Sequence, residues 1–283
     1  MGTAILTSLI KAGLNPTDTK VSTKSQQSAA ALIAQFGVQA FAQENNADAN
    51  AQAAAGVEVV ILGVKPAYIT EVAAQIAPIL APNTIVISVA AGVTIRAIEE
   101  QLPAQIAVIR AMPNTPALIG RGVTGIAQSP AQASTQAGNL ANTDASTPKA
   151  SALSPIEIAT QLFETVGKVL VVEESQIDAL STISGSGPAY VFLLMEKFTK
   201  AAIALGFTQA QAELMVHETF AGASELVGQT GEDPAELRRK VTSPNGTTMQ
   251  AIARFESANL EQVFIEATEA ALKRAKEIAS GLG

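Results

Sequence analysis

The fold is decided by residues 57–64, which read VEVVILGV. This almost continuous apolar run is rich in Val and Ile, as is typical of a strand buried on both faces of a sheet. A second run of this kind, TIVISVA, covers residues 84–90, and residues 67–80 between the two carry apolar side chains at helical spacing. A strand, a helix and a second strand in this order predict a unit of a parallel sheet.

The rest of the first half continues this alternation. Strands are predicted over residues 20–22, 106–110, 122–128 and 168–174, and helices over residues 3–13, 25–36, 94–102 and 156–166. Short strands that alternate with helices indicate a doubly wound parallel sheet, because each parallel connection needs a crossover segment. A helical bundle with apolar loops is a poor alternative, since these runs are short and rich in Val and Ile.

Residues 129–154 interrupt the alternation. They are mostly Ala, Ser, Thr, Gln and Asn, and their only large apolar residues are Leu140 and Leu153. Such a segment cannot bury enough apolar surface to offset the entropy cost of ordering it. It is therefore predicted to be a flexible surface insertion that carries no chemistry.

Deletion of residues 130–150 is expected to leave stability and activity nearly unchanged, because these residues offer almost no apolar surface to a core. The check is a comparison of Tm and turnover between the deletion variant and the full chain. A large fall in Tm, or lost turnover, would show that the segment is structural.

From residue 176 onward the sequence predicts only helices. They cover residues 187–205, 209–228, 234–240, 246–256 and 259–280. Charged residues make up 15% of the chain, against roughly 25% in average soluble domains, so much of the helical surface is expected to lie against another subunit. We therefore predict a first domain of residues 1–174 and an all-α domain of residues 175–283.

The composition excludes several classes of protein. The 283-residue chain has no Cys and one His, His217, so disulfide frameworks, thiol nucleophiles and metal sites built from Cys or clustered His are ruled out, and no metal is expected. The net charge of −7 argues against nucleic acid or an anionic membrane as the main partner. No apolar run reaches the roughly 18–20 residues that cross a bilayer. Because no basic residue precedes the first apolar ones, a cytoplasmic protein is expected.

Three predicted strands are followed by polar, Gly or Pro residues, at the edge where open parallel sheets bind ligands. The segments are GVKP (63–66), AAGVTI (90–95) and RAMPNTP (110–116). Lys65 either contacts a phosphate or carboxylate or is a solvated lysine at a strand end. Gly92 either lets a flat ring approach the backbone or forms an ordinary turn. Asn114 either bonds a ligand or shapes its loop.

Two further motifs precede predicted helices. SGSGPAY (184–190) places free backbone N–H groups before a helix, which would favour an anion or a carboxamide. TSPNGTT (242–248) gathers hydroxyl and amide groups, and its alternative role is a simple helix N-cap. His217 is interpreted as a surface or interface residue, because no Ser–His–Asp arrangement accompanies it.

In this order and spacing, the five motifs resemble those of the pyrroline-5-carboxylate reductases. The resemblance covers nearly the whole chain apart from residues 129–154. It implies an α/β Rossmann-type doubly wound parallel sheet that binds NADPH or NADH, followed by an all-α dimerisation domain, in a homodimer that assembles into a higher oligomer. It also implies an oxidoreductase that reduces 1-pyrroline-5-carboxylate to L-proline, the last step of proline biosynthesis.

The same resemblance assigns the cofactor site. The residues expected to bind NADPH or NADH are Gly2, Ser22, Lys24, Asn50, Val64, Lys65, Pro66, Ala91 and Gly92. Residues 64–66 would line the cofactor cleft, and residues 91–92 would lie near the nicotinamide. Asn50 would contact the adenosine side. Ser22 and Lys24 would lie near a 2′-phosphate, which favours NADPH.

The substrate site is expected in the TSPNGTT loop, supplied by the partner subunit. By resemblance, Ser243, Gly246 and Thr248 hold the carboxylate and ring nitrogen of the substrate, and Thr248 is the catalytic residue. Asn245 stands where the family has a glycine, and Asn tolerates a positive φ better than most residues.

The chemistry of the motifs fits this assignment. Reduction of an imine carbon needs a positioned hydride donor and hydrogen bonds to carboxylate and nitrogen, but no strong general base. The related hydroxyacid dehydrogenases carry a lysine on the helix that follows their glycine segment. Residues 188–194 contain no lysine, and Lys197 lies about two turns beyond the motif, which argues against a hydroxy acid.

The amino terminus departs from the family pattern. The family begins with a strand and a GxGxxG-type turn ending in Asn-Met-Gly, of which Met1-Gly2 matches only the end. A gap or a substitute strand is therefore expected between the strands near 20–22 and 57–64. NADPH binding is expected to be weak, because the first helix keeps its dipole but lacks the glycine turn. Two alternatives remain open: a truncated, non-catalytic paralogue that only assembles through its helical domain, and a reductase of another cyclic imine.

Overall fold

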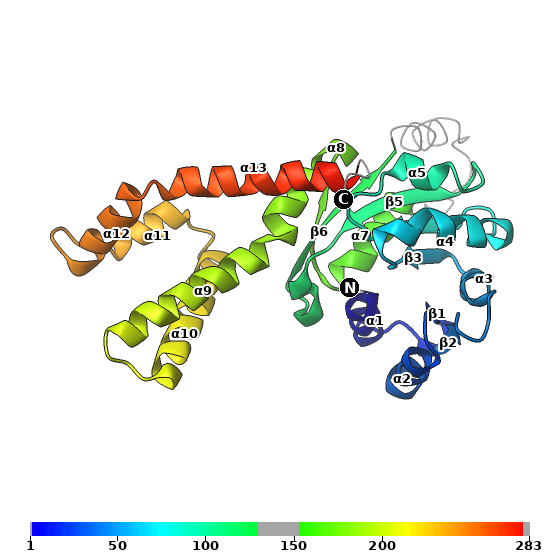
Figure 1. Ribbon diagram of the computed structural model, residues 1–283, viewed down its shortest axis with the longest axis horizontal. Helices are drawn as coiled ribbons and strands as arrows, with labels where there is room; N and C mark the ends of the chain where they lie inside the picture. The colour runs from blue at the N-terminus through cyan, green and yellow to red at the C-terminus, as the bar shows by residue number, and fades with distance from the viewer. Residues whose placement is uncertain (1, 130–152, 280–283) are drawn as a thin grey trace, which may run out of the picture. The chain divides into compact units, whose positions relative to one another are not determined.

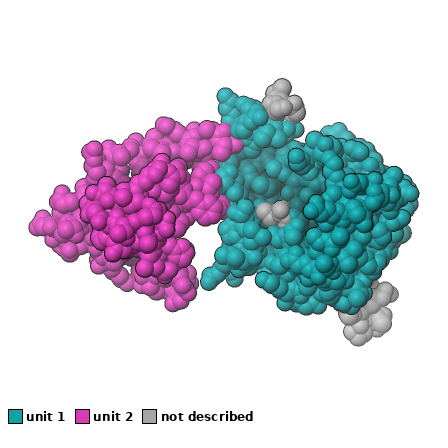
Figure 2. Space-filling view, turned by 60° about the horizontal axis from the view of Figure 1, so that its bottom comes forward, with its two compact units in different colours: residues 1–186, 272–283 teal, residues 187–271 magenta. Residues whose placement is uncertain are grey.

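The computed structural model describes residues 2–129 and 153–279 (Figure 1). The chain divides into two compact units, residues 1–186 with 272–283 and residues 187–271 (Figure 2). Most of the predicted insertion, residues 130–152, lies outside the described residues. The domain boundary predicted after residue 174 falls at the start of helix α8 (Glu174–Leu180), whereas the first compact unit continues to Ser186.

The first unit is built on a five-stranded sheet in the order β3-β4-β5-β6-β7. Its strands are β3 (Val59–Leu62), β4 (Ile85–Ser88), β5 (Ala107–Met112), β6 (Gly122–Gln128) and β7 (Gly167–Val171). The predicted α/β class is confirmed, but β5 and β6 pair antiparallel while the other neighbours are parallel. The physical reason is the short link over residues 113–121, because a parallel crossover takes about a dozen residues or more.

Two further strands form a sheet of their own. β1 (Lys20–Thr23) and β2 (Gln39–Ala42) pair in parallel. Within the described residues, β1 pairs only with β2 and β3 only with β4, so the predicted break between residues 20–22 and 57–64 is confirmed. The sequence did not predict β2 or helix α3 (Ala49–Ala54).

Helices cover both faces of the five-stranded sheet (Figure 1). The described α-helices of this unit are α1 (Gly2–Lys11), α2 (Gln26–Phe36), α3, α4 (Ile69–Ile76), α5 (Ile95–Glu99), α7 (Pro155–Glu164), α8 and the last part of α13 (Leu260–Ala279). Val86 and Val108 face the core under α4, α5 and α8, whereas Ile87 and Ile109 face the core under α1 and α7. Because the central strands are buried on both faces, their sequence is apolar at successive positions.

The second unit is helical, as predicted. Its helices are α9 (Gly187–Ala204), α10 (Gln209–Thr230), α11 (Pro234–Lys240), α12 (Thr247–Ser257) and the first part of α13 (Leu260–Ala279). The Phe198 and Phe220 rings join α9 to α10 edge to face, with centroids 6.5 Å apart. Many large apolar side chains are nevertheless exposed, among them Phe192, Leu205, Leu214, Phe255 and Val263. Apolar exposure on this scale marks an interaction surface.

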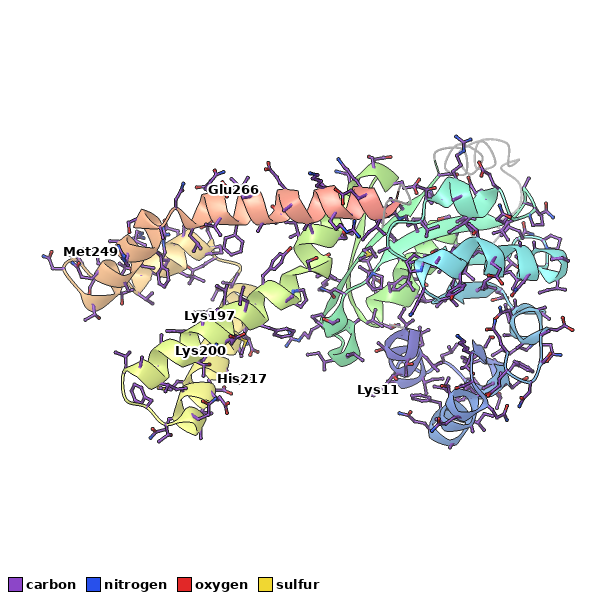
Figure 3. The ribbon with its side chains drawn as sticks, viewed as in Figure 1. Lys11, Lys197, Lys200, His217, Met249 and Glu266 are labelled. Atoms are coloured by element: carbon purple, nitrogen blue, oxygen red, sulfur yellow. The ribbon has the colours of Figure 1, made fainter. Side chains whose placement is uncertain are left out.

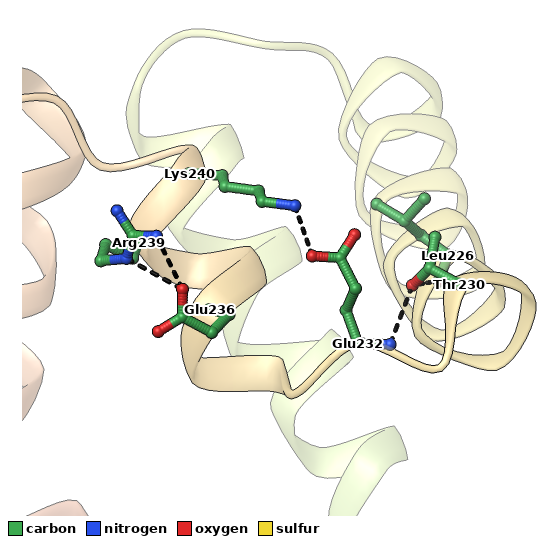
Figure 4. Close-up of polar contacts among 6 residues, drawn as sticks. All are labelled: Leu226, Thr230, Glu232, Glu236, Arg239 and Lys240. Carbon is green, nitrogen blue, oxygen red and sulfur yellow. Dashed lines mark hydrogen bonds and ion pairs between the residues drawn. The ribbon is translucent and has the colours of Figure 1, made fainter.

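Polar contacts fix the segment that leads into the TSPNGTT motif (Figure 4). Near the end of α10 the Thr230 hydroxyl donates to the Leu226 carbonyl at 2.9 Å and accepts from the Glu232 amide at 3.2 Å. Lys240 pairs with Glu232 across the turn, and Arg239 pairs with Glu236 at 2.7 Å. The Lys240–Glu232 pair links the end of α11 to the turn that follows α10, three residues before Ser243, while the other bonds are local to one helix end. None of the described helices is long and apolar enough to cross a membrane.

Candidate active site

The turn between β4 and α5 forms one wall of a cavity in the first unit. Gly92 has a φ of 75°, in the left-handed region that glycine adopts without strain. A Cβ at Gly92 would lie 3.4 Å from the backbone of Ala279 and from Cγ2 of Ile278, so the end of α13 covers the turn. A cavity of about 80 Å³ is lined by Ala91, Gly92, Met112, Asp178, Ala275 and Ile278. It accommodates part of a ring rather than a whole cofactor, since ligand pockets span about 300–1,000 Å³.

The GVKP segment meets the amino terminus of α1 at the carboxyl end of β3. The Gly2 Cα lies 3.7 Å from where a Cβ on Gly63 would stand, so the backbones of the two segments lie next to each other. Val64, Lys65 and Pro66 follow directly and are exposed. Four of the predicted cofactor residues therefore gather at one strand end.

The predicted adenosine-side residues also meet. The Ser22 hydroxyl, on β1, donates to Asn50 Oδ1 at 2.6 Å. Asn50 is buried at 7% exposure, and its amide donates to Gln75 Oε1 on α4 at 2.7 Å. The Lys24 side chain, two residues beyond Ser22, is exposed. The structure thus joins Ser22 and Asn50 and leaves Lys24 open to solvent.

The RAMPNTP segment is tied through Asn114 to the SGSGPAY motif and to strand β6. The Asn114 amide donates to the Ser184 carbonyl of SGSGPAY at 2.9 Å, and its Oδ1 accepts the Val123 amide at 2.9 Å. Asn114 is only 7% exposed. Of the two roles left open by the sequence, the structure therefore shows Asn114 shaping its loop.

A buried arginine beside the cavity was not predicted to matter. Arg110, on β5, is 3% exposed and pairs with Asp178 at 2.5 Å and with Glu174 at 3.6 Å, both on α8. Asp178 lines the cavity, as does Met112. The sequence did contain a sign of this role, because Arg110 is a charged residue in a predicted apolar strand. A buried charge requires partners of opposite charge. Those partners are 64 and 68 residues away in sequence (174 − 110 and 178 − 110), so no local pattern could name them.

The TSPNGTT loop belongs to the second unit and opens α12; Met249, labelled in Figure 3, marks its place. Asn245 has a φ of 56°, in agreement with the prediction that Asn would tolerate the conformation of a glycine. A Cβ at Gly246 would lie 2.5 Å from the Ser243 hydroxyl oxygen and 3.1 Å from the Ser243 carbonyl oxygen, so any larger residue would force the Ser243 side chain to move. Ser243 is exposed and Thr248 is half-buried. The loop thus presents hydroxyl groups on a rigid turn.

Comparisons with known proteins place this arrangement in a class. Residues 1–92 match the family model "NADP oxidoreductase coenzyme F420-dependent", and residues 174–278 match "Pyrroline-5-carboxylate reductase dimerisation". The sheet with a glycine turn at its carboxyl edge, followed by a helical dimerisation domain, defines an NAD(P)-dependent oxidoreductase.

Individual relatives narrow this class to a family. A pyrroline-5-carboxylate reductase of Corynebacterium melassecola is 35% identical and aligns over 98% of this chain and 95% of its own length. The chain belongs to the pyrroline-5-carboxylate reductase family. The solved structure of the Coxiella burnetii pyrroline-5-carboxylate reductase has a TM-score of 0.83 at 36% identity, covering 98% of this chain and 94% of that one. A Plasmodium falciparum pyrroline carboxylate reductase, solved with NADP bound, shares the fold, with a TM-score of 0.78 at 22% identity over 99% of this chain and 94% of that one.

Proposed function

We propose that this chain reduces 1-pyrroline-5-carboxylate to L-proline with NADPH or NADH, the last step of proline biosynthesis. The observation that carries the proposal is the match over 98% of the chain to a protein named pyrroline-5-carboxylate reductase. A bound nicotinamide would supply the hydride that reduces the imine carbon. The π electrons of the C=N bond would move to the ring nitrogen, which would take its proton from solvent, so the product would be a secondary amine and the cofactor would leave oxidised.

The cofactor fits the residues on the first unit. The amino terminus of α1 at Gly2 and the exposed GVKP segment offer backbone N–H groups and space at one strand end. Residues 91–92 line the small cavity and would hold the nicotinamide edge. Ser22 and Asn50, already bonded to each other, would hold the adenosine ribose, and Lys24 would face a 2′-phosphate.

The substrate is held by the TSPNGTT loop in this proposal. Ser243 and the backbone at Gly246 would bind the carboxylate, and the Thr248 hydroxyl would hydrogen-bond the ring nitrogen. Binding of the carboxylate and of the ring nitrogen requires no general base. The close packing of Gly246 against Ser243 keeps the Ser243 hydroxyl and the Gly246 backbone in place. We propose that the partner subunit supplies this loop to each active site.

Assembly and compartment complete the proposal. The family model for dimerisation covers residues 174–278, and the exposed apolar side chains of this unit supply the surface for a homodimer. We propose that these dimers assemble into a higher oligomer. In this proposal residues 1–174 bind the cofactor and residues 175–283 form the dimer. The enzyme works in the cytoplasm, where NAD(P)H is recycled.

The test is an assay of NADPH oxidation by 1-pyrroline-5-carboxylate, with the cofactor concentration raised until the rate saturates and proline quantified as product. Equal amounts of oxidised cofactor and proline are expected. Turnover only with another cyclic imine would indicate a different substrate, and assembly without any turnover would indicate the non-catalytic alternative.

Replacement of Lys24 by Ala is expected to raise the KM for NADPH about tenfold, because one charge-assisted contact to a 2′-phosphate is lost. The KM for NADH should stay unchanged, since NADH has no such phosphate. The matched control is Lys11→Ala, at the other end of α1 from Gly2 (Figure 3). Equal effects of Lys24→Ala on both cofactors would contradict the placement of Lys24.

A further inference from the structure

The Gly92 turn is anchored by a side chain that comes from far along the chain. The Ile95 amide, which opens α5, donates to Glu174 Oε1 on α8 at 2.7 Å. Another amide of the first turn of α5, that of Ala97, donates to the Thr94 hydroxyl at 3.2 Å. Because the first amides of a helix lack partners within it, an external carboxylate at this point fixes where the helix begins.

The carboxylate is itself held in place. Arg110 Nη1 lies 3.6 Å from the same Glu174 Oε1, while Arg110 Nη2 bonds Asp178 one turn further along α8. Arg110 is 3% exposed, and the two carboxylates are 28% and 23% exposed. One buried guanidinium thus spaces two acids on α8, and the Glu174 side chain is directed at the β4–α5 connection.

This arrangement couples three walls of one cavity. Gly92 and Ala91 lie three and four residues before Ile95, Asp178 is on α8, and Met112 follows Arg110 on β5. Ala279 and Ile278 cover the Gly92 turn, and Ala90 and Ile95 on either side of it are buried in the core. The bond at Ile95 adds a polar link from the turn to α8, and this link contributes to the position of the turn.

We propose that Glu174 is a positioning residue for hydride transfer. It accepts a hydrogen bond from the Ile95 amide while it is paired to Arg110, and it thereby fixes the position of the Gly92 turn relative to the nicotinamide. The proposal rests on the reductase function above. Glu174 touches neither cofactor nor substrate in this scheme, and it acts through the turn.

The test compares Glu174→Ala, which removes the acceptor, with Glu174→Gln, which keeps an acceptor oxygen for the Ile95 amide. The matched control is Glu173→Ala, which removes the carboxylate of the neighbouring N-cap residue of α8, a group that makes no bond to Ile95. Glu174→Ala is expected to lower kcat about tenfold at saturating NADPH and substrate, since one hydrogen bond is lost. The KM for 1-pyrroline-5-carboxylate should stay unchanged, and Glu174→Gln should restore most of kcat.

Hydrogen exchange gives a readout that does not depend on activity. In Glu174→Ala, amides of residues 90–97 should exchange at least several times faster than in the wild-type chain, and in Glu174→Gln and Glu173→Ala they should not. Unchanged exchange in Glu174→Ala, or equal loss of kcat in the Ala, Gln and Glu173→Ala variants, would overturn the proposal. If the wild-type chain fails to reduce 1-pyrroline-5-carboxylate, the proposed function fails, while the exchange result still decides whether Glu174 holds the turn.

Discussion

Replacement of Arg110 by Met is expected to lower the free energy of unfolding by about 3 kcal/mol, the lower end of the range for a broken buried ion pair. The variant leaves Glu174 and Asp178 side by side without their shared cation. The cost stays at the lower end because both carboxylates keep about a quarter of their surface in water. A unit of this size should then lose about 6–12 °C in Tm.

Calorimetry or thermal circular dichroism checks this result. The matched control is Arg96→Met, because Arg96 also pairs with a glutamate, Glu100 at 2.9 Å, but its side chain is 86% exposed. An exposed pair contributes at most about 1 kcal/mol, so Tm should hardly move. Equal Tm values for the two variants would show that the Arg110 cluster adds nothing to stability.

Replacement of Thr248 by Ala is expected to lower kcat about 5- to 150-fold, which corresponds to a lost hydrogen bond of about 1–3 kcal/mol. Its hydroxyl is proposed to bond the substrate nitrogen, and it is half-buried at the start of α12. Tm should change little, because no described group bonds this hydroxyl in the isolated chain. Steady-state kinetics and a melting curve measure the two effects separately.

Two variants control for this substitution. Thr247→Ala changes the neighbouring residue on the same helix and should keep full turnover, and Thr248→Ser should keep most of it because the hydroxyl remains. Activity of Thr248→Ala within twofold of wild type, while other changes in the loop abolish turnover, would show that another group bonds the nitrogen.

The parts of the fold that could be predicted are those with a strong apolar pattern, either a continuous run or a helical repeat. β3 and β4 were recognised because their Val and Ile runs have no other explanation, and the long helices of the second unit because their apolar residues recur at helical spacing. β2 and α3 were missed, since they have four and six residues and consist mainly of Ala and Gln. The reversed direction of β6 was missed because apolar periodicity carries no information on strand direction.

The features of the candidate site also fall into those that local sequence predicts and those that depend on tertiary packing. The motifs and the tolerance of Asn245 for positive φ follow from local sequence, and the structure bears out that conformation. The contacts of Arg110 and Asn114 depend on segments about 70 residues away, which only tertiary packing brings together. The assignments of Thr248, Ser243 and Lys24 come from resemblance and stay predictions until the variants are measured.

The separate sheet of β1 and β2 makes the first unit a candidate for stepwise opening. The strands β1 and β2 pair with each other, and helices α2 and α3 follow them closely in sequence. The link from this part to α4 includes the Asn50–Gln75 side-chain bond and the packing of Ala54 into the core. Such a segment can behave as a foldon that opens below the global unfolding energy. Amides of residues 20–23 and 39–42 would then exchange before those of β4 and β5. A dinucleotide whose adenosine half engages Ser22 would slow this exchange by mass action, because it would bind only the closed form of this part.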